Sequence, residues 1–301
     1  MNHTAATLLA AACLAFATGT AQAESSRGSG ENAVANAITA YDAAALLGGD
    51  AGGVIRIDET AFEAGAGLIT FSELPLGTNN PVYAPATYGG AGDDPQVSFG
   101  GFFNGQSLGD ASTCPPGAAL TGCVIGDATG PLAFAAGAPA TLIVGDSANP
   151  TSPVLSGSPT FNGPIAILFD SDVAGVGLDG GFFDDVGGTA ITAFARDGSV
   201  IGSVLNEGTA IEFLGLVTAD GSDTIAGLLF SLVGAESAGF AIDNVRFGRG
   251  DVVQPPGPPP PPPAPPAPAR PVPTTGAFAL FGLVIGLFVV AAVAGRRQAR
   301  R

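Results

Sequence analysis

The chain has 301 residues, with 26 acidic side chains, 10 Lys and Arg, a single His and no Trp. All of the acidic residues lie between Glu24 and Asp251 beside five Arg and no Lys, and such a surface disfavours binding to nucleic acid or anionic lipid. The single histidine, His3, is close to the N-terminus, so catalysis by Ser-His-Asp or Cys-His groups and HExxH-type zinc chemistry are excluded.

Residues 1–23 are predicted to form a secretory signal peptide. An apolar stretch over residues 7–18, too short to span a bilayer, precedes Ala21-Gln22-Ala23, which has the A-x-A form of a cleavage site. Lipid modification at Cys13 is the alternative. We therefore expect an exported protein that begins at Glu24. In the N-terminal segment that follows, residues 24–66, the apolar spacing of residues 32–47 predicts one short helix.

Residues 67–250 have the pattern of an all-β domain. Short runs rich in β-branched and aromatic residues are separated by Gly and Pro, which favours a β-sandwich. The clearest signal is at residues 189–205, where two alternating runs flank Arg196-Asp197-Gly198. Asp-Gly is the pair that a tight type I′ hairpin requires. The other expected strands are at 69–74, 97–99, 164–169, 211–217, 224–231 and 239–247.

Two cysteines, Cys114 and Cys123, remain after removal of the signal peptide. In an oxidising compartment a pair this close is expected to form a disulfide that closes a small loop. A metal site needs more ligands than two thiols, and none stand nearby in the sequence.

The C-terminal part predicts a spacer followed by a membrane segment. Residues 251–273 form a Pro-rich linker, in which 13 of the 19 residues from Pro255 to Pro273 are Pro. Such a run adopts polyproline II and spans roughly 60 Å at about 3.1 Å per residue. Residues 277–294 carry no charge and are just long enough for a transmembrane helix, and the Arg-rich end holds the terminus on the cytoplasmic side.

The order of parts at residues 274–301 resembles a sorting signal. The motif Pro271-Val272-Pro273-Thr274-Thr275-Gly276, an apolar helix and a terminal Arg cluster are similar to the tail of the PEP-CTERM family, exported bacterial proteins sorted by exosortases. The Glu-Pro of the family's name is absent here. The same residues also resemble a sortase signal of LPXTG type, with Val for Leu and cleavage between Thr275 and Gly276. Either resemblance implies an exosortase or sortase-type partner, a transient membrane anchor and display at the cell surface.

The β-rich part carries a second resemblance. The runs Phe169-Asp170, Gly175-Val176-Gly177 (expected as a turn), 193–198, 213–215 and 240–247 look like the jelly-roll domain of PEP-CTERM surface proteins. That domain is similar in fold to calcium-containing carbohydrate-binding modules. The resemblance implies a jelly-roll β-sandwich and an association with exopolysaccharide or the cell envelope.

The resemblance also implies a structural Ca²⁺ held by Glu73 and Asp243. Strict alternation from Gly239 to Phe247 would place Asp243 on one face with Ala241, Val245 and Phe247, so we expect its carboxylate to be buried. A buried carboxylate needs a cation or strong donors, and calcium suits an acid-rich extracellular protein. Hydrogen bonds from neighbouring backbone N–H groups are the alternative.

The favoured function is a non-catalytic surface or matrix protein that associates with glycan. One alternative is a polysaccharide-active enzyme that uses two carboxylates, for which Asp184-Asp185 or Asp220 with Asp223 would be candidates. Another is a structural spacer without a ligand. With no Trp, a sugar platform would have to come from residues such as Tyr83 and Tyr88, for which turn and edge packing is the alternative.

Overall fold

The computed structural model describes residues 53–237, 239–253 and 255. The signal cleavage site at Ala21 and Ala23, the helix expected at 32–47, the sorting motif at 272–276 and the apolar segment 277–294 lie outside these residues. Within the described part, none of the helices combines the length and the apolar character that crossing a bilayer would require.

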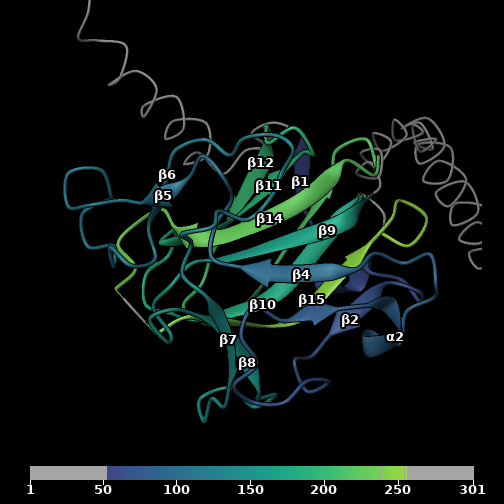
Figure 1. The fold of residues 1–301 in the computed structure, drawn as a ribbon, viewed down its shortest axis with the longest axis horizontal. Coiled ribbons are helices and arrows are strands. Elements are labelled where there is room, and N and C mark those ends of the chain that lie inside the picture. The colour runs from purple at the N-terminus through teal and green to yellow at the C-terminus, as the bar shows by residue number, and fades with distance from the viewer. Residues whose placement is uncertain (1–52, 238, 254, 256–301) are drawn as a thin grey trace, which may run out of the picture. The chain divides into compact units, whose positions relative to one another are not determined.

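The domain is all-β, and its larger sheet is antiparallel with seven strands (Figure 1). Its order is β1-β13-β10-β15-β8-β7, and β2 also pairs with β15. The strands are β1 (Val54–Arg56), β2 (Gly67–Ile69), β7 (Thr141–Val144), β8 (Val154–Gly157), β10 (Gly175–Phe183), β13 (Ala210–Thr218) and β15 (Ala241–Gly248).

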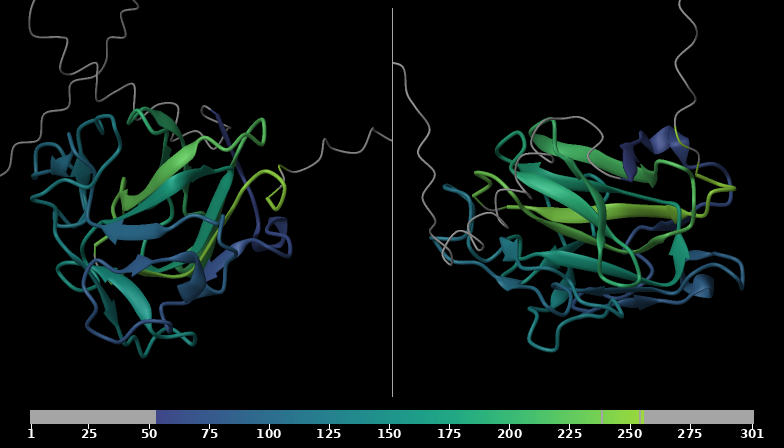
Figure 2. Two further views of the ribbon diagram at one scale, coloured as in Figure 1. Left: turned by 45° about the vertical axis from the view of Figure 1, so that its right-hand side comes forward. Right: turned by 90° about the horizontal axis from the view of Figure 1, so that it is seen from above.

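The second antiparallel sheet has six strands in the order β12-β11-β14-β9-β4-β3. They are β3 (Val82–Tyr83), β4 (Val97–Gly100), β9 (Ile165–Val173), β11 (Thr189–Phe194), β12 (Val200–Leu205) and β14 (Ile225–Leu232). The two sheets face each other across the main apolar core, which gives a sandwich-like arrangement (Figure 2). Phe169 on β9 meets Phe247 on β15 with ring centroids 5.4 Å apart, so aromatic contacts join the layers.

Residues 101–139, here called the cover, pack in part on the outer face of the six-stranded sheet, while the loop that contains Cys114 and Cys123 packs against the main core. Phe103 and Leu132 from the cover pack with Phe194, Ala226 and Leu229 of the sheet in a second apolar cluster. The cover includes a small hairpin of β5 (Ser107–Leu108) and β6 (Val124–Ile125). This hairpin lies at the opposite end of the domain from helix α2 (Pro85–Tyr88) in Figure 1. Within the described residues the other helical element is a 3-10 turn, η1 (Glu59–Ala61).

The strand expected at residues 69–74 is wrong except at its first residue. β2 ends at Ile69, and Phe71 takes a left-handed backbone with φ of 57°. This turn places the Phe71 ring in the core, where it meets Tyr83 and Phe99 edge-on at 6.1 and 5.4 Å. Burial of the ring thus replaces further strand pairing.

The hairpin expected at 189–205 is confirmed, but its turn is not the two-residue type I′ form. Ala195 and Ser199 form the closing hydrogen bond at 2.9 Å, and Gly198 is the residue with positive φ, at 86°. Three residues therefore make the turn, with glycine in the left-handed position. Gly175-Val176-Gly177, expected as a turn, is instead the beginning of β10.

Candidate functional site

Asp243 is buried, as the sequence predicts, with 1 % of its surface exposed, but it does not face the main core. A bulge at Asn244, whose φ is 47°, shifts the pairing of β15 with β10. Ile242 and Val245 therefore both pack into the core, and Asp243 points to the other side of the sheet beside its cross-strand partner Asp179. The expected shared face with Val245 is wrong because strict alternation stops at the bulge.

The loop between β7 and β8 covers the Asp243 carboxylate. Thr151 Oγ1 donates a hydrogen bond to Asp243 Oδ2 at 2.5 Å, and Asn149 Nδ2 donates to the same oxygen at 3.4 Å. The backbone N–H of Asn244 donates to Oδ1 at 2.8 Å. Three donors thus bind the buried carboxylate, but only the Asn244 N–H is a neighbouring backbone group of the kind named as the alternative to a metal; the other two donors are side chains of the loop.

Asp179 and Asp243 form an unfavourable carboxylate pair. Burial raises the pKa of Asp243 to about 6; bonds from Thr151 and Asn244 oppose this, and the nearby Asp179 carboxylate adds to it. Burial also raises the pKa of Asp179, against the hydrogen bond from Asn244 Nδ2 at 2.8 Å and the charge of Arg246. The pair therefore holds protons more tightly than ordinary carboxyl groups do.

Glu73 has its own set of partners. Its Oε1 accepts hydrogen bonds from the Thr70 backbone N–H at 3.0 Å and from the Thr70 hydroxyl at 2.8 Å. Its Oε2 is buried without a hydrogen-bond partner, as is the hydroxyl of Tyr83. Burial, together with the Glu73 charge, raises the pKa of Tyr83. Glu73 and Asp243 share no hydrogen-bond partner among the described residues, and the calcium site predicted for them stays a prediction.

A metal centre of several protein ligands is not formed in the described ranges. No group of three or more His, Cys, Asp or Glu side chains lies together there as a metal ion would require. The two metal-ligating candidates that the sequence supplied, Glu73 and Asp243, each accept hydrogen bonds from protein groups instead.

The predicted disulfide between Cys114 and Cys123 is confirmed. It closes a loop of the cover that packs on the β14–β15 connection. Ala119 N–H donates to the Glu236 carbonyl at 2.8 Å, and Leu232 N–H donates to the Gly122 carbonyl at 3.1 Å. The bond therefore ties part of the cover to the six-stranded sheet.

The residues that were candidates for a catalytic carboxylate pair take part in local hydrogen bonds, for Asp184 and Asp185 through their backbone N–H groups. The backbone N–H groups of Asp184 and Asp185 donate to the Glu236 carboxylate, with distances of 2.9 to 3.2 Å, and Glu236 is fully buried. Asp220 accepts bonds from Ser222 in a turn, and Asp223 accepts one from the Gly250 N–H at 2.8 Å. None of these residues lines the cavity described below.

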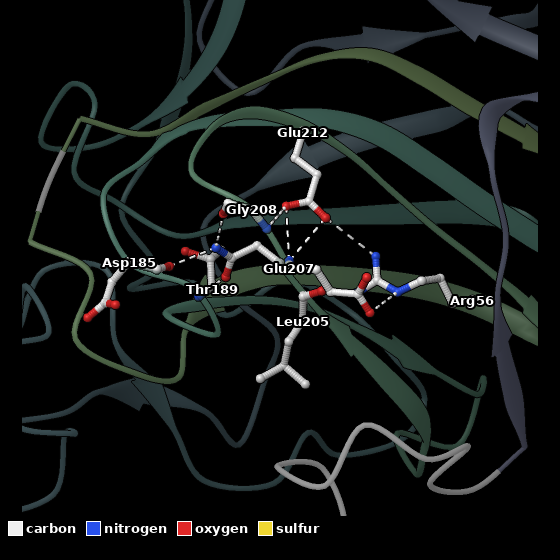
Figure 3. Close-up of polar contacts among 8 residues, drawn as sticks. Arg56, Asp185, Thr189, Leu205, Glu207, Gly208 and Glu212 are labelled. Atoms are coloured by element: carbon white, nitrogen blue, oxygen red, sulfur yellow. Dashed lines mark hydrogen bonds and ion pairs between the residues drawn. The ribbon is translucent and has the colours of Figure 1, made fainter.

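Each arginine in the described residues is held by an acidic side chain or a carbonyl. Arg56 lies 3.3 Å from Glu207 and 3.6 Å from Glu212 in ion pairs (Figure 3). Arg196 pairs with Asp172 and Arg246 with Glu59, while Arg249 donates to the Asp93 carbonyl at 3.0 Å. Most of the 22 described carboxylates therefore lack a cationic partner, and the surface is acidic.

The corner shown in Figure 3 brings Asp185, Thr189 and Gly208 together, and hydrogen bonds of the Asn206 side chain join these three residues. Asn206 is 1 % exposed; its Oδ1 accepts from the Thr189 N–H at 2.9 Å, and its Nδ2 donates to the carbonyls of Asp185 and Gly208 at 2.7 and 2.8 Å. The Glu212 carboxylate accepts from the N–H groups of Glu207 and Gly208. These bonds fix the β12–β13 connection, and the corner is structural.

A cavity of about 400 Å³ opens on the outer face of the six-stranded sheet. It lies between strands β3, β4 and β9 on one side and residues 134–139 of the cover on the other. No Asp, Glu, His, Lys or Arg lines it. Its lining includes Asn80, Val82, Ser98, Gly100, Phe134 and Pro139.

The tyrosines do not form an exposed platform. Tyr83 is fully buried in β3, and Tyr88 packs its ring edge-on against Phe247 at 5.2 Å while donating its hydroxyl to the Pro95 carbonyl at 2.7 Å. Packing, the alternative for these residues, is what the structure has. Sequence reasoning missed the cavity, because its lining comes from four separated stretches of uncharged residues with no motif.

No protein-family model matches the sequence, and no curated protein is similar to it.

Proposed function

We propose that this protein is an exported, surface-displayed protein whose sandwich is a jelly roll and binds polysaccharide without catalysing its cleavage. The observation that carries the proposal is the cavity on the six-stranded sheet, whose lining has no titratable side chain. Acid–base catalysis needs such a group within hydrogen-bond reach of the substrate, whereas binding needs shape, apolar surface and a few polar atoms. The jelly-roll assignment rests on the two facing antiparallel sheets together with the resemblance described above.

A binding assay beside a hydrolysis assay tests this proposal. The purified protein would be titrated with a panel of neutral and acidic polysaccharides, and the same mixtures would be analysed for released reducing ends. We expect binding without release. Release of sugar by the wild-type protein would contradict the non-catalytic function, and the absence of both would favour the spacer alternative.

A polysaccharide-active enzyme is the second candidate, favoured by the adjacent carboxyl groups of Asp179 and Asp243. Their raised pKa values would suit a general acid and its partner. Against this function, Asp243 is 1 % exposed and is covered by Thr151 and Asn149, so a substrate would first have to displace the loop. The Asp179→Asn variant would lose any hydrolytic activity under this alternative and would keep binding under the favoured one.

Surface display by a PEP-CTERM-like or sortase-like route is part of the proposal. It is supported by the order of the Pro-containing motif, the apolar stretch and the Arg cluster at residues 271–301. Mass spectrometry of protein extracted from the cell surface should find peptides that begin at Glu24 and none beyond Gly276. Recovery of intact C-terminal Arg-containing peptides from the membrane would instead indicate a permanent anchor.

A structural calcium ion remains part of the proposal, supported at Glu73 by the buried carboxylate oxygen that has no partner. Calcium at about a hundred times its dissociation constant should add about 2.7 kcal/mol to the free energy of unfolding by mass action. The Glu73→Gln variant should lose this gain, and so should Asp243→Asn if both residues ligate. A melting temperature of the wild type that is unchanged by EDTA would remove the ion from the proposal.

A further inference from the structure

The cavity on the six-stranded sheet is formed by strand register and by glycine. Val97 and Phe99 are buried in the core, so Ser98, between them on β4, faces outward. Val82 and Leu168 are the cross-strand partners of Ser98 on either side, which places these three side chains in one row on the cavity floor.

Two glycines make room for the opposite wall. A Cβ at Gly100 would lie 2.8 Å from the Phe134 ring, and one at Gly101 would lie 2.4 Å from the Pro139 carbonyl oxygen. The Phe134 ring is fixed by stacking on Phe103, with centroids 5.8 Å apart and planes 6° from parallel. The wall is therefore a rigid aromatic and apolar surface rather than a mobile loop edge.

Two polar groups that line the cavity make no hydrogen bond within the described residues. Asn80 uses its Oδ1 to accept from the Thr141 N–H at 2.8 Å, but its Nδ2 has no hydrogen-bond partner in the described residues. The Ser98 hydroxyl likewise makes no hydrogen bond within the described ranges, although Ser98 is half-buried. One amide donor and one hydroxyl thus stand beside an aromatic ring in a cavity without charge.

We propose that this cavity binds an uncharged sugar residue within a neutral polysaccharide chain. The inference rests on the proposed polysaccharide-binding function and names its site and its ligand class. Apolar faces of sugars pack on aromatic rings, and their hydroxyl groups pair with amide and hydroxyl side chains. The lining offers no cation for a uronate or sulfate group, and the surrounding acidic domain repels anionic chains. A neutral chain meets neither obstacle.

Calorimetric titration of the full-length protein would test the site with three neutral polysaccharides, dextran, laminarin and galactomannan, and with alginate as the anionic probe. Ala136→Trp adds a large side chain at an exposed lining position and should weaken binding of the neutral polysaccharide by at least tenfold. Ala136→Ser is the matched control and should bind as the wild type does. Ser98→Ala should weaken binding about threefold to tenfold through loss of one hydrogen bond.

The outcomes separate the site from the function. Wild-type binding to a neutral polysaccharide that neither Ala136→Trp nor Ser98→Ala weakens would overturn this site and leave the proposed function intact. Tighter binding of alginate than of the neutral chains would overturn the ligand class. No binding of any of the four by the wild type would overturn the site together with the proposed function. Ser98→Ala removes only one outward-facing hydroxyl oxygen and is expected to fold. It therefore tests the site even if Ala136→Trp does not fold.

Discussion

Replacing Asp243 by Asn should stabilise the protein at neutral pH when calcium is absent. Asp243 is 1 % exposed and lies beside Asp179, and its pKa is about 6 against an ordinary value of 3.8. A shift of this size corresponds to about 3 kcal/mol of unfavourable free energy for the charged form, at 1.36 kcal/mol for each pKa unit.

The pH dependence follows from the direction of that shift. The folded protein binds the Asp243 proton more tightly than the unfolded chain does, so this group contributes stability below pH 3.8 that is lost as the pH rises through 6. Between these values the wild-type free energy of unfolding should decrease relative to that of Asp243→Asn by up to about 1.4 kcal/mol per pH unit. The Asn side chain stays neutral, can still accept from the Asn244 N–H, and can donate to Thr151 Oγ1.

Urea unfolding of both proteins in EDTA at pH 4, 5, 6 and 7.5 would measure the difference. We expect equal stability at pH 4 and an advantage of Asp243→Asn approaching 3 kcal/mol at pH 7.5. A variant that is less stable than the wild type at pH 7.5, with an unchanged pH slope, would refute the reasoning. Repeating the series with calcium distinguishes a metal site, because a bound cation favours the charged carboxylate and reverses the sign.

Two further predictions concern structural side chains. Asn206 is 1 % exposed, and Asn206→Ala removes three hydrogen bonds. We expect this variant to lower the free energy of unfolding, measured by urea titration, by about 2–4 kcal/mol. The control is Asn79→Ala, at an exposed position with no side-chain hydrogen bond within the described residues, which should change the free energy of unfolding by less than about 0.5 kcal/mol. Alkylation of the native protein without reductant should label no cysteine of the mature chain, whereas Cys114→Ser should expose one thiol. The same variant should lower the free energy of unfolding by about 2.7 kcal/mol, as expected for opening a loop with a sequence separation of 9. Two labelled thiols in exported protein would contradict the disulfide.

The strands that the sequence predicted correctly are rich in apolar and β-branched side chains. The sequence pattern identified β11 and β12 by alternation, and the segments that became β9, β13, β14 and β15 by short runs of β-branched and aromatic residues. It failed for β10, whose glycines are typical of turns. In the fold, a Cβ at Gly177 would lie 2.4 Å from the Phe213 ring and one at Gly175 would lie 2.5 Å from Val253. These glycines make room for neighbouring side chains, which only the assembled sheet reveals.

Only part of the candidate site could be predicted from the sequence, because the rest depends on how the strands pair and pack. Burial of Asp243 follows from its apolar neighbours, but its direction depends on the bulge at Asn244, a residue type that tolerates left-handed backbone without marking it in the sequence. The cover at residues 101–139 carried no periodic signal, because its Phe and Leu side chains pack as individual contacts on the sheet. The cavity lies between the six-stranded sheet and the cover, so it could not be predicted before both of these were placed.

The partners of the arginine side chains bear on how proteases that cut after basic residues would act on the folded domain. Residues 53–237, 239–253 and 255 contain no Lys and four Arg, each held by an acidic side chain or a carbonyl. An enzyme that cuts after basic residues must draw the guanidinium into its own specificity pocket, with the flanking chain extended. Cleavage of the folded domain therefore requires local opening at Arg56, Arg196, Arg246 or Arg249, and its rate reports the population of the opened states. We therefore expect trypsin to cut the folded domain at these four arginines more slowly than the urea-unfolded domain.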